Sequence, residues 1–163
     1  MDNYQVAING TGLAARILGI ETPDVQFFYN QDLKAKGINS IFLKEGYIIA
    51  FNEEWIEQAN PMEIQITCFH EARHAFQWKC INGEYRTKID QETIQTWKEE
   101  MSNYNQPTQS DIPEQDYLKQ KIEIDAIAFA HYQMDKLFNV KSPIPDMIAK
   151  EVQCKLFQYE GRD

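Results

Sequence analysis

Hydrophobic and polar positions alternate with two different periods in the first part of the chain. After Thr11 the apolar residues recur at helical spacing, which predicts a short helix that Thr11 caps and Gly19 ends. Beyond Pro23 the pattern changes, because Val25 with Phe27 and Phe28 is typical of a strand. The segment therefore predicts one helix followed by one strand.

Two further apolar runs predict a hairpin. Residues 41–43 and 47–51 are both apolar, and they flank the tripeptide Lys44-Glu45-Gly46, whose glycine suits a tight turn. Together with the strand near Val25, the hairpin gives a small sheet of three strands.

After Asn52 the pattern is helical almost to the end of the chain. Pro61 is tolerated in the first turn of a long helix, and Asn82-Gly83 marks its end. A polar stretch from Asn105 to Glu114 contains two prolines and is interpreted as a mobile loop. The predicted helical segments are Glu53 to Gln58, Pro61 to Cys80, Gln91 to Asn103, the buried helix Gln115 to Phe138, and a last helix that follows Pro145 and reaches about Tyr159.

These elements predict an α+β fold, in which a small three-stranded sheet is followed by a mainly helical remainder. The chain has 163 residues, of which 43% are hydrophobic, so it can bury one core of ordinary size. No repeat, low-complexity tract or second-domain boundary is visible. We therefore expect a single domain over residues 1–163.

The balance of charge excludes some partners. The chain has 16 Lys and Arg against 25 Asp and Glu, which gives a net charge of −9, and it has no basic run. Nucleic acid and anionic membrane surfaces are therefore not expected as partners. The first residues lack a secretory signal and no apolar segment is long enough to span a membrane, so we expect a cytoplasmic protein.

The three cysteines are expected to be reduced. Cys68 and Cys80 lie on the same predicted helix at a separation of roughly 18 Å, which is too far for a disulfide. None of the three cysteines is part of a Cys-x-x-Cys pair.

The candidate chemistry lies in the segment HEARH, residues 70–74. His70 and His74 are four residues apart on a helix, so both imidazoles project from one face and can reach one tetrahedral metal ion. Glu71 follows the first histidine, where its carboxylate can take a proton from a water on the open position of the metal. This spacing predicts a zinc-dependent hydrolase.

A catalytic zinc usually has a third protein ligand. His131, Glu123, Asp125 and Asp135 are candidates from the predicted helix over residues 115–138. The helical wheel favours Glu123, which shares its face with Ala126 and Ala130, where small side chains let another helix approach closely. Asp125 points away from that face and is kept as the alternative.

The HExxH segment followed by EIDAIAFA over residues 123–130 resembles the gluzincins, most closely the ImmA/IrrE-type peptidases of bacterial mobile elements. Those proteins carry Glu-x-x-Ala-Asn-x-Phe-Ala on a later helix. The resemblance implies a minimal zincin-like metallopeptidase domain with His70, His74 and Glu123 as zinc ligands, and with Glu71 as general base. It also implies a peptide or protein substrate, which would pair with a sheet edge within Tyr47 to Phe51.

The chain departs from the family pattern at two positions. Arg73 stands where the family usually has Gly, and Ile127 stands where it has Asn or Asp. In gluzincins that polar residue often orients a histidine ligand, so here another residue must do so. The departure favours an alternative function, a zincin-like binding or regulatory protein that has lost turnover. Arg73 is interpreted as a solvated or paired surface arginine, or else as a substrate contact.

Three further interpretations concern the surroundings of the site. Tyr117, Tyr132 and His131 are candidate donors to an oxyanion. Gln77 and Trp78 are candidate walls of the cleft. A structural zinc site closed by four protein ligands is a third alternative, and it would need Cys68, Cys80 or His131 as the fourth ligand.

Overall fold

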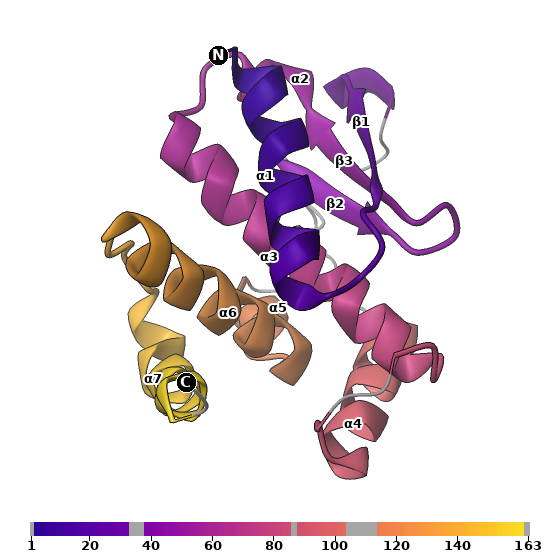
Figure 1. The fold of residues 1–163 in the computed structure, drawn as a ribbon, viewed down its shortest axis with the longest axis vertical. Coiled ribbons are helices and arrows are strands. Elements are labelled where there is room, and N and C mark those ends of the chain that lie inside the picture. The colour runs from indigo at the N-terminus through magenta and orange to yellow at the C-terminus, as the bar shows by residue number, and fades with distance from the viewer. Residues whose placement is uncertain (1, 33–37, 86–87, 104–113, 162–163) are drawn as a thin grey trace.

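The computed structural model describes residues 2–32, 38–85, 88–103 and 114–161. Within them the chain forms a three-stranded sheet and seven α-helices, so the predicted α+β fold is confirmed (Figure 1). In chain order the elements are α1 (Asn3–Leu18), β1 (Asp24–Phe28), η1 (Asn30–Asp32), β2 (Ser40–Leu43), β3 (Ile48–Asn52), α2 (Glu53–Ile56), α3 (Pro61–Ile81), α4 (Gln91–Ser102), α5 (Glu114–Leu118), α6 (Lys121–Phe138), η2 (Asp146–Ile148) and α7 (Ala149–Glu160).

The sheet has the strand order β1-β3-β2. β1 runs parallel to β3, and β2 runs antiparallel to it with Ser40 opposite Phe51, which confirms the predicted hairpin. Because β3 has a partner on each side, a peptide cannot pair with it, and the expectation that residues 47–51 form the sheet edge is wrong. The edge strand that lies beside α3 is β2.

The turn of the hairpin differs from the expected glycine turn. The left-handed residue is Tyr47, with φ of 53°, whereas Gly46 keeps a negative φ. Contacts of the Tyr47 side chain compensate for this strain: its hydroxyl donates to the carbonyl of Glu21 at 2.7 Å, and the Lys79 ammonium lies 4.5 Å from its ring centroid.

The first helix is longer than its apolar pattern predicts. It begins at Asn3, where the Asp2 side chain accepts from the backbone N–H of Gln5, so the prediction that Thr11 caps it is wrong. Gly10 does not interrupt the helix. A Cβ added there would lie 2.9 Å from Sγ of Cys68 on α3, so the glycine allows the two helices to pack closely.

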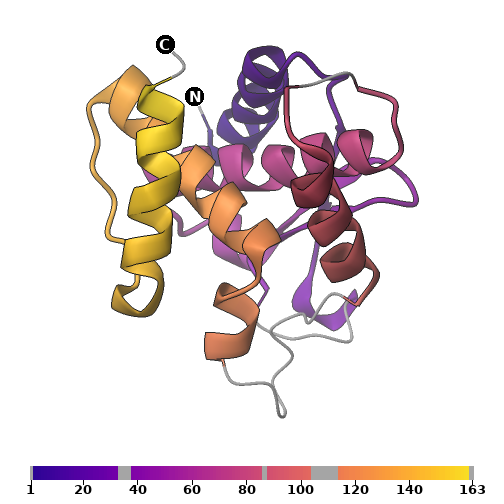
Figure 2. The same ribbon diagram turned by 90° about the horizontal axis from the view of Figure 1, so that it is seen from below.

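The long predicted helix is α3, which passes through the middle of the molecule (Figures 1 and 2). Asn60 and Glu63 form a capping box at its start, and Gly83, with φ of 69°, follows its end. Its buried residues face α1 and the sheet on one side and α6 on another. The expectation that the histidine face lines a cleft is confirmed, because His70, Glu71 and His74 line two neighbouring cavities, although His74 and Glu71 are each only 6% exposed.

The helix expected over residues 115–138 is divided in two. α5 ends at Leu118 and α6 begins at Lys121, so the prediction of one continuous helix is wrong. The start of α6 is fixed by another helix: the carboxylate of Glu100 on α4 accepts from the backbone N–H groups of Lys121 and Ile122 at 3.0 and 2.8 Å. An acidic group at this position satisfies N–H groups that the helix itself leaves unpaired.

Other predictions have simpler outcomes. The mobile loop expected from Asn105 to Glu114 lies outside the described residues, except for Glu114, which begins α5. All three cysteines are free, as their spacing predicts. Among the helices that the structure describes, none is long and apolar enough to cross a membrane.

Candidate metal centre

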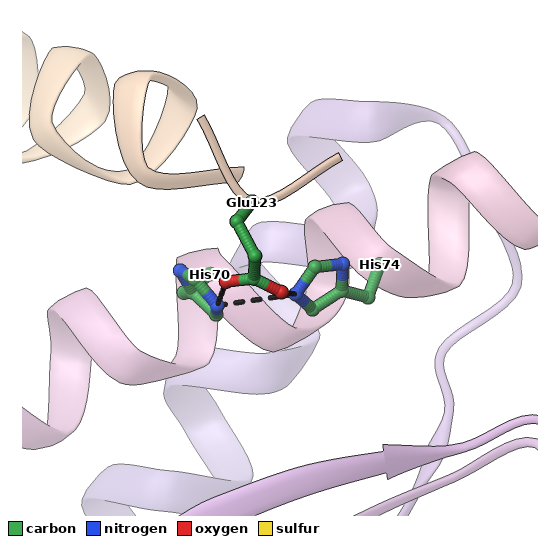
Figure 3. Close-up of side chains that lie close together, drawn as sticks. All are labelled: His70, His74 and Glu123. Carbon is green, nitrogen blue, oxygen red and sulfur yellow. Dashed lines mark hydrogen bonds and ion pairs between the residues drawn. The ribbon is translucent and has the colours of Figure 1, made fainter. Parts of the chain in front are cut away.

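Three side chains from two helices converge on one point. His70 and His74 project from α3, and Glu123 projects toward them from the first turn of α6 (Figure 3). Nε2 of His70 and Nε2 of His74 are 3.1 Å apart, and they lie 3.3 and 3.0 Å from the two carboxylate oxygens of Glu123. Within the described part of the chain, this is the one group of three or more such side chains whose ligand atoms all lie within 4.8 Å of one another.

The local sequence explains the convergence. The four-residue spacing of His70 and His74 places both rings on one face of α3. On α6, Ala126 and Ala130 are buried and small, and they let the helix approach closely enough for the Glu123 side chain to reach both rings. The helical-wheel argument that favours Glu123 is in agreement with this arrangement.

The donor set fits a metal ion. Two imidazole nitrogens and one carboxylate are ligands that transition metals accept, and three protein ligands are the usual number in a catalytic zinc site. Their atoms already point to a common centre, so a cation can bind without a rearrangement of either helix. The three residues can therefore hold a metal ion.

Charge and burial act against each other in this cluster. Burial disfavours the charged form of His74, but the neighbouring Glu123 carboxylate outweighs it and raises the pKa of His74 to about 9. Glu123 is completely buried, which alone would raise its pKa, yet the two histidines hold that pKa well below its usual value. The carboxylate is thus kept ionised, the form in which it can coordinate a cation.

Asp125, the alternative ligand, is occupied elsewhere. Its two oxygens accept from Nε and Nη2 of Arg73 at 2.8 and 3.2 Å, and one of them also accepts from the hydroxyl of Tyr159 at 3.0 Å. The structure therefore brings Glu123 to the histidines and holds Asp125 away from them.

Arg73 is buried, so its interpretation as a surface arginine is wrong. Its guanidinium carbon lies 4.3 Å from the ring centroid of Phe76 and 5.1 Å from that of Phe129. Burial alone would lower the pKa of Arg73, but the Asp125 carboxylate outweighs burial and keeps this pKa above its usual value. The prediction that it pairs with an acid is confirmed.

Gln77 was expected to line the cleft, and this is also wrong, because the residue is fully buried. Its Oε1 lies 2.8 Å from Nδ1 of His74, while its Nε2 donates to Oδ2 of Asp125 at 2.8 Å and to the carbonyl of Ile122 at 3.0 Å. The sequence does contain a signal for this contact, since Gln77 follows His74 by three residues and so lies on the same face of the helix.

Glu71 lies on a groove beside the histidines. Its Oε1 accepts a hydrogen bond of 2.6 Å from the hydroxyl of Ser40 on β2. Two cavities of about 310 and 350 Å³ meet here, one on the side of His74 and one on the side of His70. Residues that line both cavities are Ile38, Ser40, Glu71 and Tyr117.

The candidate oxyanion donors divide by position. Tyr117 lines both cavities and His131 lines the one beside His70, whereas Tyr132 stacks on Tyr159 with ring centroids 5.5 Å apart. Burial, with a contribution from His70, lowers the pKa of His131. A neutral imidazole or a phenol at these positions can donate a hydrogen bond into the groove.

A fourth protein ligand is not seen in the residues that the structure describes. Neither Cys68, Cys80 nor His131 joins the group formed by His70, His74 and Glu123. Cys68 instead donates to the carbonyl of Ala7 on α1. The closed structural zinc site is therefore not supported by the arrangement of these side chains.

Comparisons with protein-family models, with curated proteins and with solved structures found no match to this chain.

Proposed function

We propose that this protein is a zinc-dependent hydrolase that cleaves peptide bonds. The observation that carries the proposal is the convergence of His70, His74 and Glu123 on one point beside the Glu71 carboxylate. Two histidines and one glutamate with one open position are typical of catalytic zinc sites and not of closed structural ones.

The zinc ion held by these three residues would supply a Lewis acid for the substrate carbonyl and for a water molecule. Glu71 acts as the general base, taking a proton from the attacking water and delivering it to the leaving amine. Ser40 donates to one oxygen of this carboxylate, which leaves the other oxygen to accept the proton. Tyr117 or His131 donates to the oxyanion that forms during attack.

The groove suggests how a peptide binds. β2 is an edge strand within the described sheet, and its residues line the cavity on the His74 side. An extended peptide can pair with such an edge through its main chain. Ile41, Leu43 and Met101 give that cavity apolar walls, which suit a hydrophobic substrate side chain next to the scissile bond.

The alternative, a binding protein that has lost turnover, depends on the absence of a polar residue at Ile127. Gln77 contacts the second ring nitrogen of His74, which is the contact that the family's polar residue makes. This removes the reason to favour loss of activity, and we therefore propose the enzyme.

The test compares the wild type with Glu71→Gln. We expect purified wild-type protein to contain one zinc by elemental analysis and to cleave members of a peptide library, with cleavage sites read by mass spectrometry. The variant should keep its zinc and lose cleavage, because the amide cannot accept the proton. A wild type that binds zinc and cuts no peptide or protein would sink the peptidase proposal while leaving the metal site intact.

A further inference from the structure

We propose that Gln77 is a positioning residue of the metal centre. Its neutral amide links the buried Arg73–Asp125 ion pair to His74 and thereby fixes the orientation of the His74 ring. The inference rests on the metal site of the proposed function and does not depend on peptidase activity. It assigns a role to a residue outside the HExxH motif and outside the three ligands.

The orientation of the Gln77 amide is fixed by its neighbours. Its Nε2 faces two acceptors, the carbonyl of Ile122 and the carboxylate of Asp125, so this atom is the NH₂ group. Oε1 must then face His74, and it can only accept a hydrogen bond. His74 therefore carries a proton on Nδ1, which leaves the lone pair of Nε2 available for a metal ion at the point where Glu123 and His70 also converge.

Asp125 is in turn held rigidly. It accepts from Arg73 through both oxygens and from Tyr159, and Arg73 is packed between aromatic rings. Gln77 is fully buried, so it cannot exchange its contacts for water without opening the interface between α3 and α6. The amide of Gln77 therefore has one available orientation, and its hydrogen bond to Nδ1 fixes the orientation of the His74 imidazole.

The use of an amide has a chemical consequence. A carboxylate in contact with the second nitrogen of a histidine ligand would add negative charge next to Glu123. The Arg73–Asp125 pair is neutral as a whole, and the Gln77 amide carries no charge, so the chain orients His74 without adding another anion next to the buried Glu123 carboxylate.

Two substitutions separate positioning from packing. In Gln77→Leu the shape is roughly kept but His74 Nδ1 loses its acceptor, so zinc affinity should fall by about 10- to 100-fold. In Gln77→Glu the acceptor is kept but the donor to Asp125 and Ile122 is lost. Its melting temperature should fall, because two carboxylates then face each other. Its zinc affinity should nevertheless be at least tenfold higher than that of Gln77→Leu.

The matched control is Gln65→Leu, which removes another buried glutamine from the same helix, at a position away from the histidines. We expect it to change the melting temperature without changing zinc affinity. Affinities are measured by competition with a chromogenic chelator, and folding is checked by thermal denaturation of each variant with and without zinc.

A second readout uses only the wild-type protein. Imidazole nitrogen shifts in the NMR spectrum of the zinc-loaded protein should show His74 coordinated through Nε2 and protonated at Nδ1. Coordination through Nδ1 would overturn the inference, as would equal zinc affinities for Gln77→Leu and wild type. If Gln77→Glu loses as much affinity as Gln77→Leu, an acceptor at Nδ1 of His74 does not support zinc binding, and the inference is wrong. A wild type that binds no zinc would overturn the inference and the proposed function together.

Discussion

The hydroxyl of Ser40 donates a hydrogen bond of 2.6 Å to Oε1 of Glu71, and this contact joins the edge strand β2 to the helix that carries both histidines. The carboxylate proposed as general base is thus oriented by the same strand on which an extended substrate would lie. The strand β2 would therefore position both the substrate and the general base.

Replacing Ser40 by Ala should lower turnover by roughly tenfold, a part of the 10²- to 10⁴-fold that general-base catalysis contributes. The zinc content should not change, because the hydrogen bond of the Ser40 hydroxyl goes to Glu71 and not to one of the three candidate ligands. Ser40→Thr keeps the hydroxyl on a strand position and should retain most of the activity. Equal turnover of Ser40→Ala and wild type in steady-state assays at matched zinc content would show that this hydrogen bond does not position the base.

Replacing Glu123 by Gln should abolish stoichiometric zinc binding, because the only anionic ligand of the group is then lost. Asp135→Asn is the matched control, since it removes an exposed carboxylate from the same helix. Added zinc should raise the melting temperature of the wild type and of the control but not that of Glu123→Gln. Zinc retention by Glu123→Gln would assign the third ligand to another residue.

The buried pair of Arg73 and Asp125 should show strong coupling. Arg73→Met or Asp125→Leu alone leaves a buried charge without its partner, and each should lower the free energy of unfolding by about 3–5 kcal/mol. The double variant should lose much less than the sum of the two, which denaturant unfolding of all four proteins can measure. Additive losses would mean that the two charges do not stabilise each other.

Two glycines of α1 should respond in opposite directions. Gly10→Ala places a Cβ 2.9 Å from Sγ of Cys68 and should lower the free energy of unfolding by about 1–3 kcal/mol. A Cβ at Gly12 meets nothing within 4 Å, so Gly12→Ala should raise it by up to about 1 kcal/mol through helix propensity. If both substitutions stabilise the protein, the helices can separate at no cost and the close approach does not matter.

The features that the sequence predicted well depend on neighbours within one or two turns. The positions of His70, Glu71 and His74 follow from helical spacing, and the hairpin follows from two apolar runs around a turn. Helix periodicity also favoured Glu123 over Asp125, because the face of a residue on a helix is fixed by its number.

The features that the sequence did not predict depend on contacts between distant segments. The start of α6 is set by Glu100 from another helix, and α1 continues through Gly10, a glycine that is needed for packing and not for a turn. Burial of Arg73 became apparent only when Asp125 and the aromatic rings were placed around it. Such contacts leave no periodic trace in a single sequence.

The hydrogen bonds from the start of α6 to Glu100 make the position of Glu123, a candidate metal ligand, depend on α4. Glu123 lies in the first turn of α6, immediately after the two N–H groups that Glu100 holds. A displacement of α4 that these bonds transmit would move the Glu123 carboxylate, and by thermodynamic reciprocity a cation bound there would oppose that displacement. A partner that docks on α4 would in this way change the affinity of Glu123 and the two histidines for a metal ion without approaching the groove.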